Sequence, residues 1–254
     1  MYKLIDSHCH LDFDVFNDDR DAVITRAKNS GVTDIVIPGV SSKNWPTLKS
    51  ICSSNQHIHP CYGLHPYLAH QHSDADINLL KQWIIQNNCV AIGECGLDYR
   101  KEQADKKTQM KFFKLQIDIA READLPVVIH SVQATEDIIK ELGKKPGLRG
   151  MVHSYSGSYE QAMTLIESGF YISLGASVSY ERAKKARNVA SKIPLSFLLL
   201  ETDAPDQPDA GHIGQRNEPS YLVNVLDCLS ELRDESKKEI AEQTSKNARE
   251  LFKI

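Results

Sequence analysis

The segment LIDSHCHLD, residues 4–12, raises the first question about the fold, because an apolar pair leads into two closely spaced histidines, His8 and His10. In a strand over residues 4–9, successive side chains point to opposite faces, so both imidazoles would lie on the same side. Two imidazoles on one face can bind a common metal ion. An amphipathic N-terminus can carry the same pattern by chance, so the interpretation depends on ligands elsewhere in the chain.

Seven further short apolar runs follow this segment, and most of them lead at once into Gly, Pro or polar residues. A strand that is buried on both faces and ends in a loop has this pattern. The seven runs are DIVIPGV (34–40), CYGLHP (61–66), VAIGECGLD (90–98), LPVVIH (125–130), GMVHSYSG (150–157), FYISLGA (170–176) and FLLLETDAP (197–205).

Amphipathic segments with helical spacing lie between these runs, and several of them end at a glycine. Repeated strand–helix units imply parallel strands, and eight strands in 254 residues match the α/β fold of a (β/α)8 TIM barrel. The alternative is a doubly wound sheet, but its first strand usually leads into a Gly-rich phosphate loop, where this chain has SHCH. No linker or low-complexity segment divides the chain, so we predict a single catalytic TIM-barrel domain over residues 1–254.

The net charge, the cysteine spacing and the length of the apolar stretches argue against several classes of protein. The net charge of −4 argues against a broadly basic surface that would coat nucleic acid, although it leaves room for a local phosphate site. The six cysteines form no CxxC pair, which argues against a zinc ribbon and for reduced thiols. No apolar stretch is long enough for a membrane span, and the N-terminus lacks signal-peptide features. We therefore expect a cytoplasmic protein without membrane association, and no feature indicates an obligate protein partner.

Histidines and carboxylates gather at the predicted strand ends. In TIM barrels the active site is built at the C-terminal ends of the strands. Five of the ten histidines would lie there, whereas a random scatter would place about one or two at such ends. We therefore predict a metal site at the C-terminal ends of the strands. The six candidate ligands are His8, His10, Glu94, His130, His153 and Asp203.

The predicted ligand set suits two divalent ions, because six ligands are too many for one tetrahedral ion. Imidazole and carboxylate together suit Zn²⁺, Mn²⁺ or, with more carboxylate, Mg²⁺. Glu94 can bridge two ions with its two oxygens, and two ions can activate a shared water for hydrolysis. Asp203 would face the metals and accept the proton of the attacking water. We therefore assign Glu94 and Asp203 catalytic roles as well as metal binding.

The motifs DSHCHLD, GLHP, GECGLDY, LPVVIHS, VHSYSGS, LLETDAP and RNEP resemble the TatD family of metal-dependent deoxyribonucleases, within the amidohydrolase-like barrels, and are most similar to its YjjV-type branch. They occur in family order over residues 6–219. The resemblance implies Mg²⁺-dependent hydrolysis of DNA phosphodiesters, often 3′→5′ from single-stranded ends. It also implies His8, His10, Glu94 and Asp203 around one metal, and Glu94, His130 and His153 around the other.

Five further residues are candidates for substrate binding. His65, in GLHP, would face the metals without ligating them, and Tyr67 would line the entrance. Tyr99 could stack on a base, since aromatic side chains bind bases in this way. Arg216 could contact a phosphate in bidentate fashion, with Asn217 beside it in the loop after the eighth strand.

One departure from the family pattern leaves the substrate open. Family members commonly carry Arg where this chain has Val132, and that Arg would touch a substrate phosphate. Three hypotheses follow: a phosphodiesterase that acts on DNA ends, a small-molecule amidohydrolase or phosphoesterase with the same metal centre, and a non-catalytic metal-stabilised barrel. The third is the weakest, because structural metal sites are usually closed and these ligands would lie at an open mouth. The segment 179–192 is rich in Lys and Arg, and we leave open whether it binds phosphate or is simply solvated.

Overall fold

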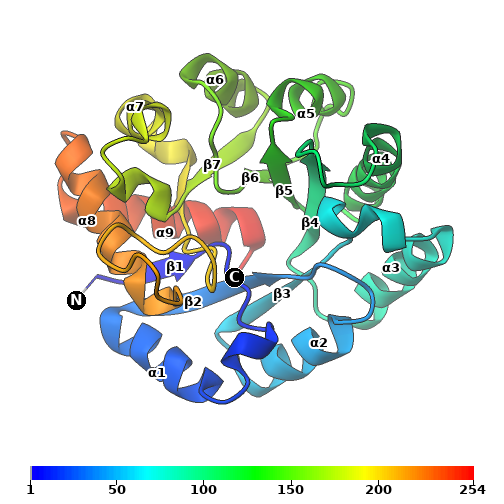
Figure 1. Ribbon diagram of the computed structural model, residues 1–254, viewed down its shortest axis with the longest axis horizontal. Helices are drawn as coiled ribbons and strands as arrows, with labels where there is room; N and C mark the ends of the chain where they lie inside the picture. Colours follow the sequence, from blue (N-terminus) through cyan, green and yellow to red (C-terminus); the bar gives the residue numbers. More distant parts are fainter. Residues whose placement is uncertain (1) are drawn as a thin grey trace.

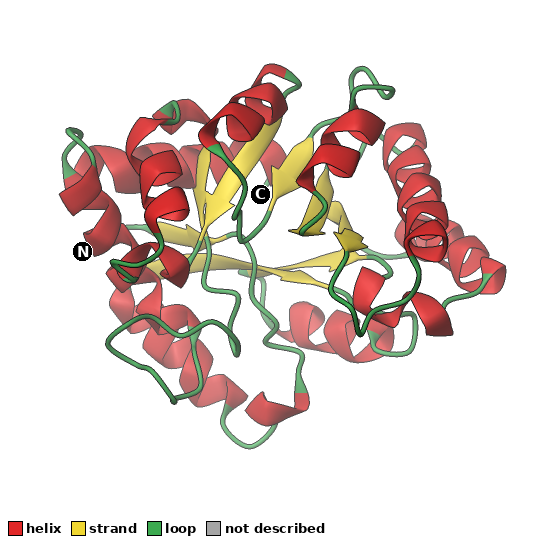
Figure 2. Cartoon of the chain, turned by 45° about the horizontal axis from the view of Figure 1, so that its top comes forward, coloured by secondary structure: helices red, strands yellow, loops and turns green. Residues whose placement is uncertain are grey.

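The computed structural model describes residues 2–254, in which eight parallel strands alternate with helices. Each strand pairs with the next one along the chain, so the sheet order is β1 to β8, and the helices surround the strands (Figures 1 and 2). This confirms the predicted (β/α)8 barrel. The strands are β1 (Leu4–Asp6), β2 (Val32–Pro38), β3 (Ile58–Tyr62), β4 (Ala91–Asp98), β5 (Val127–Val132), β6 (Gly150–Val152), β7 (Phe170–Leu174) and β8 (Leu198–Leu200).

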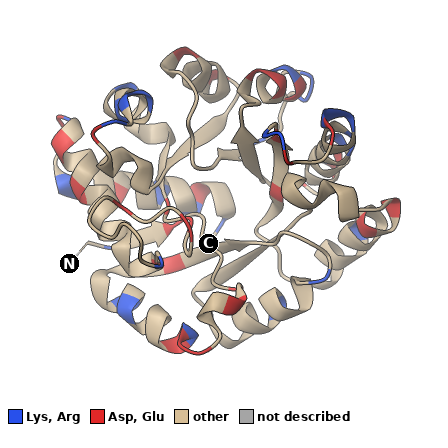
Figure 3. Ribbon diagram, in the orientation of Figure 1, with Lys and Arg blue, Asp and Glu red and all other residues tan. Residues whose placement is uncertain are grey.

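The helices follow the strands in turn, and two of them follow β8. Capping boxes begin three of the helices, at Ser73, Ser158 and Ser236, and Gly31 ends the first one in the left-handed conformation that glycine favours. Charged side chains lie mainly on these outer helices (Figure 3). The helices are α1 (Arg20–Ser30), α2 (Trp45–Ser54), α3 (Asp74–Gln86), α4 (Lys106–Glu122), α5 (Thr135–Leu142), α6 (Tyr159–Glu167), α7 (Lys184–Lys192), α8 (Leu222–Leu232) and α9 (Lys237–Phe252).

Helix α9 closes the N-terminal end of the barrel. Its residues Ala248, Leu251 and Phe252 are buried in one cluster with side chains from seven of the strands. Because this cluster fills the N-terminal end of the barrel, the open mouth is at the opposite end, where the strands end. The strand residues of the cluster include Ile5, Val36, Cys61, Ala91, Val128, Met151 and Leu199. Among residues 2–254 no helix combines the length and the apolar character that crossing a membrane requires.

Hydrogen bonds between the end of β1 and the end of β8 close the barrel. The backbone N–H of Ser7 donates to the carbonyl of Leu200 over 3.0 Å. The buried carboxylate of Asp6 accepts from the backbone N–H of Thr202 over 3.0 Å and from its hydroxyl over 2.6 Å. The segments that carry the first and the last predicted ligands are therefore held side by side.

We expect Asp6→Ala to lower the free energy of unfolding by about 2–3 kcal/mol, because it leaves buried donors of Thr202 without an acceptor. Urea unfolding followed by circular dichroism measures the loss. Asp6→Asn is the matched control, since it keeps one acceptor oxygen and should cost less. An Asp6→Ala protein as stable as wild type would show that this contact does not hold the barrel closed.

Candidate metal centre

The alternation of side chains along the strands brings the predicted ligands to one layer at the barrel mouth. Residues two apart on a strand point the same way. Val128 and Met151 point into the barrel against α9, so His130 and His153, two residues further on, point into the barrel one layer higher. Leu199 in the same way directs Glu201 into that layer.

The N-terminal histidines lie beyond their strand. β1 ends at Asp6, so the prediction of a strand over residues 4–9 is wrong for its last three residues. The segment is nevertheless held between its neighbours, because Cys9 N–H donates to Val36 and Asp203 N–H donates to the carbonyl of His8. As a result the Nε2 atoms of His8 and His10 lie 3.2 Å apart, as expected for two imidazoles that face one site.

Glu94 and His130 are brought together by the close packing of β4 on β5. Gly96 pairs with His130, and its φ of 142° is open to glycine but rarely to other residues. A Cβ atom on residue 96 would lie 2.0 Å from the carbonyl oxygen of His130, so only glycine fits. This approach leaves Glu94 Oε1 2.8 Å from His130 Nδ1.

Four donor atoms converge on one side of Glu94, and we call them the first donor set: His8 Nε2, His10 Nε2, Glu94 Oε2 and Asp203 Oδ1. The two histidines lie 3.2 and 3.4 Å from Glu94 Oε2, and 3.4 and 3.8 Å from Asp203 Oδ1. Ligands about 2.1 Å from a tetrahedral ion lie roughly 3.4 Å apart. The spacing of this set therefore suits one divalent ion.

The other oxygen of Glu94 lies in the second donor set: Glu94 Oε1, His65 Nε2, His130 Nδ1 and His153 Nε2. His153 and His130 are each 2.8 Å from Glu94 Oε1, and His65 is 3.1 Å from it. The nitrogen atoms of His130 and His153 lie 3.1 Å apart. Glu94 is thus the one residue that both donor sets share, with one oxygen in each.

The burial and the charge of the side chains in the two donor sets favour binding of a cation between them. Glu94 Oε2 is buried without a hydrogen-bond partner among residues 2–254, although two imidazoles lie within 3.4 Å. Burial would raise the pKa of Glu94, but the imidazoles that surround it hold it well below its usual value. Burial would lower the pKa of His153, but Glu94 and Glu201 raise it well above its usual value. The residues present therefore fit the divalent ions that the sequence predicts.

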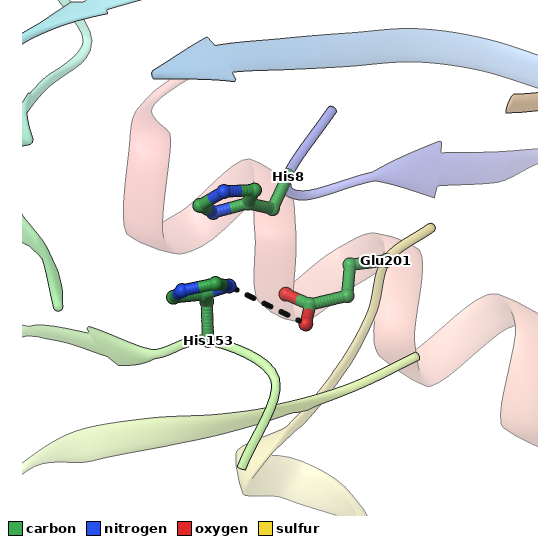
Figure 4. Close-up of side chains that lie close together, drawn as sticks. All are labelled: His8, His153 and Glu201. Atoms are coloured by element: carbon green, nitrogen blue, oxygen red, sulfur yellow. Dashed lines mark ion pairs between the residues drawn. The ribbon is translucent and has the colours of Figure 1, made fainter. Parts of the chain in front are cut away.

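Two buried carboxylates behind the histidines orient them toward the centre. His130 Nε2 lies 3.2 Å from Asp98 Oδ2, and a carboxylate of lowered pKa can only accept, so the proton sits on Nε2 and Nδ1 offers its lone pair to the second set. His153 Nδ1 faces Glu201 Oε1 across 3.8 Å (Figure 4), an ion-pair distance that is too long for a hydrogen bond, while its Nε2 faces Glu94. Such carboxylate–histidine pairs are common behind metal ligands.

His65 has the opposite arrangement. Its Nδ1 accepts the backbone N–H of Tyr67 over 3.0 Å, so the proton of the neutral ring sits on Nε2 and points at Glu94. Burial lowers the pKa of His65 to about 4, so the ring is neutral at pH 7. A nitrogen that carries a proton cannot ligate a metal. The geometry therefore agrees with a histidine that faces the centre as a hydrogen-bond donor.

We expect His65→Ala to keep the metal content of the protein while kcat falls by about 10²-fold, the lower end of what proton donation contributes. His130→Ala is the matched comparison from the same donor set, and it should lose metal. Elemental analysis of both purified variants, alongside steady-state kinetics, measures the difference. Equal loss of metal in the two variants would make His65 a ligand.

The centre opens into a cleft of about 650 Å³ at the mouth of the barrel. Tyr67, whose exposed fraction is 53%, lines this cleft together with Phe13 and Arg100. Val132 lies in its wall beside His130 and His153, at the position where a family Arg was expected. The cleft is therefore accessible to a substrate from solvent.

Three of the predicted substrate residues are engaged elsewhere in the fold. Arg216 forms an ion pair with Asp19, with 2.7 Å between Nη2 and Oδ2. The amide of Asn217 is buried and donates to backbone carbonyls, among them that of Thr202. The hydroxyl of Tyr99 donates to Asp137 over 2.7 Å. The structure does not bring these side chains into the metal cleft.

Sequence reasoning missed Asp98 and Glu201. A signal for Glu201 was available, because it precedes Asp203 by two residues and so shares its facing on an extended chain. For Asp98 the sequence offers no comparable signal, since its role depends on the position of His130 on the neighbouring strand.

Comparison with known proteins gives consistent results over almost the whole chain. The family model for TatD related DNase matches residues 5–253. The chain is 36% identical to YjjV of Escherichia coli (strain K12), an uncharacterized metal-dependent hydrolase, over 99% of this chain and 98% of that protein. It is also 36% identical to the metal-dependent hydrolase YabD of Bacillus subtilis (strain 168), over 99% of both chains.

Solved structures agree with this result. The crystal structure of the TatD homologue YjjV from Escherichia coli superposes with a TM-score of 0.95 over 99% of this chain and 98% of that one. The phosphotriesterase homology protein of Escherichia coli is 15% identical, with a TM-score of 0.63 over 99% of this chain and 98% of that chain, so it shares the barrel fold.

Proposed function

Because the chain belongs to the TatD-related DNase family and is a metal-dependent hydrolase, we propose that it is a deoxyribonuclease that hydrolyses DNA phosphodiester bonds with two divalent ions. In this proposal the first donor set holds one ion. Glu94, His130 and His153 hold the other, with Mg²⁺, Mn²⁺ or Zn²⁺ as candidates. A 3′→5′ exonuclease on single-stranded ends is the form of the activity that we propose.

The proposal rests mainly on the position of Glu94, whose two carboxylate oxygens lie in different donor sets beside an open cleft. Its two oxygens face different histidine pairs, with contacts of 2.8–3.4 Å. A shared carboxylate is how two ions are held close together, and such pairs serve phosphodiester hydrolysis by stabilising the attacking and leaving oxygens. An open cleft beside the sets supports catalysis over a purely structural site.

In this proposal Asp203 accepts a proton and His65 donates one. Asp203 reaches the first donor set with Oδ1, while its Oδ2 accepts from Gln207 Nε2. We assign to this carboxylate the proton of the attacking water. The proton on His65 Nε2 is directed at Glu94 and the cleft, where it can donate to an oxygen of the substrate. Both side chains are largely buried in the wall of the cleft.

A small-molecule amidohydrolase or phosphoesterase is the second candidate. Val132 places an apolar side chain in the cleft wall, and the net charge of the chain is −4. Both features suit a small substrate better than a polyanion, because a polyanion is attracted by positive charge. The metal centre itself would serve either substrate.

An activity panel on metal-free protein separates the two candidates. Mg²⁺, Mn²⁺ and Zn²⁺ are added back singly and tested on single-stranded oligodeoxynucleotides, simple phosphodiesters, carboxylic esters and amides. The deoxyribonuclease proposal expects oligonucleotide hydrolysis that weakens steeply with salt, since phosphate contacts release counterions. Hydrolysis of small esters or amides only, with little dependence on salt, would contradict it.

A further inference from the structure

A second cavity, of about 530 Å³, adjoins the metal cleft on the side of β7 and α7. It shares several lining residues with that cleft, including His130, His153 and Asp203. Its far wall is formed by the start of α7 and the residues before it, so we call it the α7 pocket. A substrate at the metal centre can therefore extend into the α7 pocket without leaving the protein surface.

Three cations line the α7 pocket: Arg182, Lys184 and Lys185. None of them forms an ion pair with a carboxylate among residues 2–254. The other arginines near the mouth differ in this respect, since Arg100 is paired with Asp98 and Arg216 with Asp19. Among the Lys and Arg residues that line the metal cleft and the α7 pocket, those without a carboxylate partner are therefore the three of the α7 pocket, and Figure 3 shows Lys and Arg on this helix.

The rest of the lining also suits an anion. Ser156 and Ser177 add hydroxyl groups, and Asp203 at the metal end is the one acidic residue among the lining residues. Helix α7 begins at Lys184, so its first-turn backbone N–H groups lie on the same wall as the lysines. Cationic side chains, hydroxyl groups and helix N-terminal amides are the groups that commonly bind phosphate.

We propose that the α7 pocket binds a phosphate of the substrate other than the one that is cleaved. The inference rests on the proposed function and makes it more specific: the preferred substrate carries at least two phosphodiesters, as a single-stranded DNA chain does. The metal centre holds the scissile phosphate and the α7 pocket holds a neighbouring one. A simple phosphodiester with one phosphate would react at the same centre without using the α7 pocket.

The test compares two substrates on the same protein in the presence of Mn²⁺. In Lys184→Ala/Lys185→Ala, we expect KM for a ten-nucleotide oligothymidylate to rise about tenfold, whereas kcat/KM for bis(4-nitrophenyl) phosphate stays at the wild-type value. Unchanged turnover of the small ester also shows that the variant is folded. Binding of the fluorescently labelled oligonucleotide without added metal is measured separately by anisotropy. The slope of log Kd against log salt should fall by about 1.4, from two lost contacts at about 0.7 each.

Lys238→Ala/Lys246→Ala is the matched control, because it removes the same charge from exposed positions on α9, at the other end of the barrel. It should leave oligonucleotide KM and the salt slope near wild type. Equal effects of the two double variants, or no effect of either, would overturn the α7 pocket as a phosphate site. Failure of the proposed function would give a different result. Wild-type protein would then bind the oligonucleotide through Lys184 and Lys185 but would not cleave it with any of the added metals.

Discussion

Asp203→Asn is expected to lower kcat by about two to four decades, because it removes the carboxylate that accepts the proton of the attacking water. The substitution is nearly isosteric. Asp203 has a φ of 56°, in the left-handed region that Asp and Asn both tolerate, so the backbone need not change. An amide at this position can still present one oxygen to the first donor set, and Gln207 can turn its own amide to keep their contact. Steady-state kinetics with oligonucleotide, over a range of pH, measures the effect.

Two readouts distinguish loss of the base from loss of metal. The ion held by Glu94, His130 and His153 should remain bound in Asp203→Asn, as elemental analysis would show. The acidic limb of the pH–rate profile should change, since it reports the essential base. Asp206→Asn, in the same loop but in neither donor set, is the control and should stay close to wild-type activity. If Asp203→Asn keeps most of its activity and the acidic limb, another group accepts the proton and the assignment of Asp203 as the base is wrong.

Glu94→Gln is expected to reduce activity by roughly four decades, the largest effect of any substitution considered. An amide has one oxygen and one NH₂ group, so it can serve only one of the two donor sets, and its NH₂ group would face the histidine nitrogens of the other. The protein should therefore bind at most one divalent ion. The loss of one ion removes several kcal/mol of transition-state stabilisation, and each decade in rate corresponds to 1.36 kcal/mol.

Glu201→Gln is the matched control for charge and burial. Glu201 is also fully buried, but it contacts His153 from behind at 3.8 Å and does not share the centre. We expect this variant to bind two ions with affinity weakened about 10–100-fold, as for other residues that orient a ligating histidine. Metal analysis at saturating Mn²⁺ compares the two variants. Two ions bound in Glu94→Gln would show that the donor sets do not depend on a shared carboxylate.

The barrel and the layer of histidines were accessible from sequence because each follows from a repeated local pattern. Short apolar runs ending in polar residues give parallel strands, and parallel strands that end at one face bring His130 and His153 together whatever the details of the loops. Closure of the barrel by Asp6 and Thr202 was not predicted, since it joins residues 196 positions apart.

The roles of individual nitrogen atoms depend on contacts that spacing does not report. Asp98, on the neighbouring strand, contacts Nε2 of His130 and leaves Nδ1 facing the centre. The backbone N–H of Tyr67 instead donates to Nδ1 of His65, so that the protonated nitrogen of His65 faces the centre. Arg216 has the side chain of a phosphate ligand, but Asp19 lies beside it and pairs with it. Charge partners far apart in sequence therefore decide which cations near the mouth are available to a substrate.

The central claim is that two divalent ions are held by two donor sets that share Glu94, and metal stoichiometry tests it most directly. Metal-free protein is titrated with Mn²⁺ by calorimetry, and bound metal is confirmed by elemental analysis. We predict two ions for wild type, and one each for His8→Ala/His10→Ala and His130→Ala/His153→Ala. One ion in wild type, or an unchanged count in either histidine pair, would contradict the account.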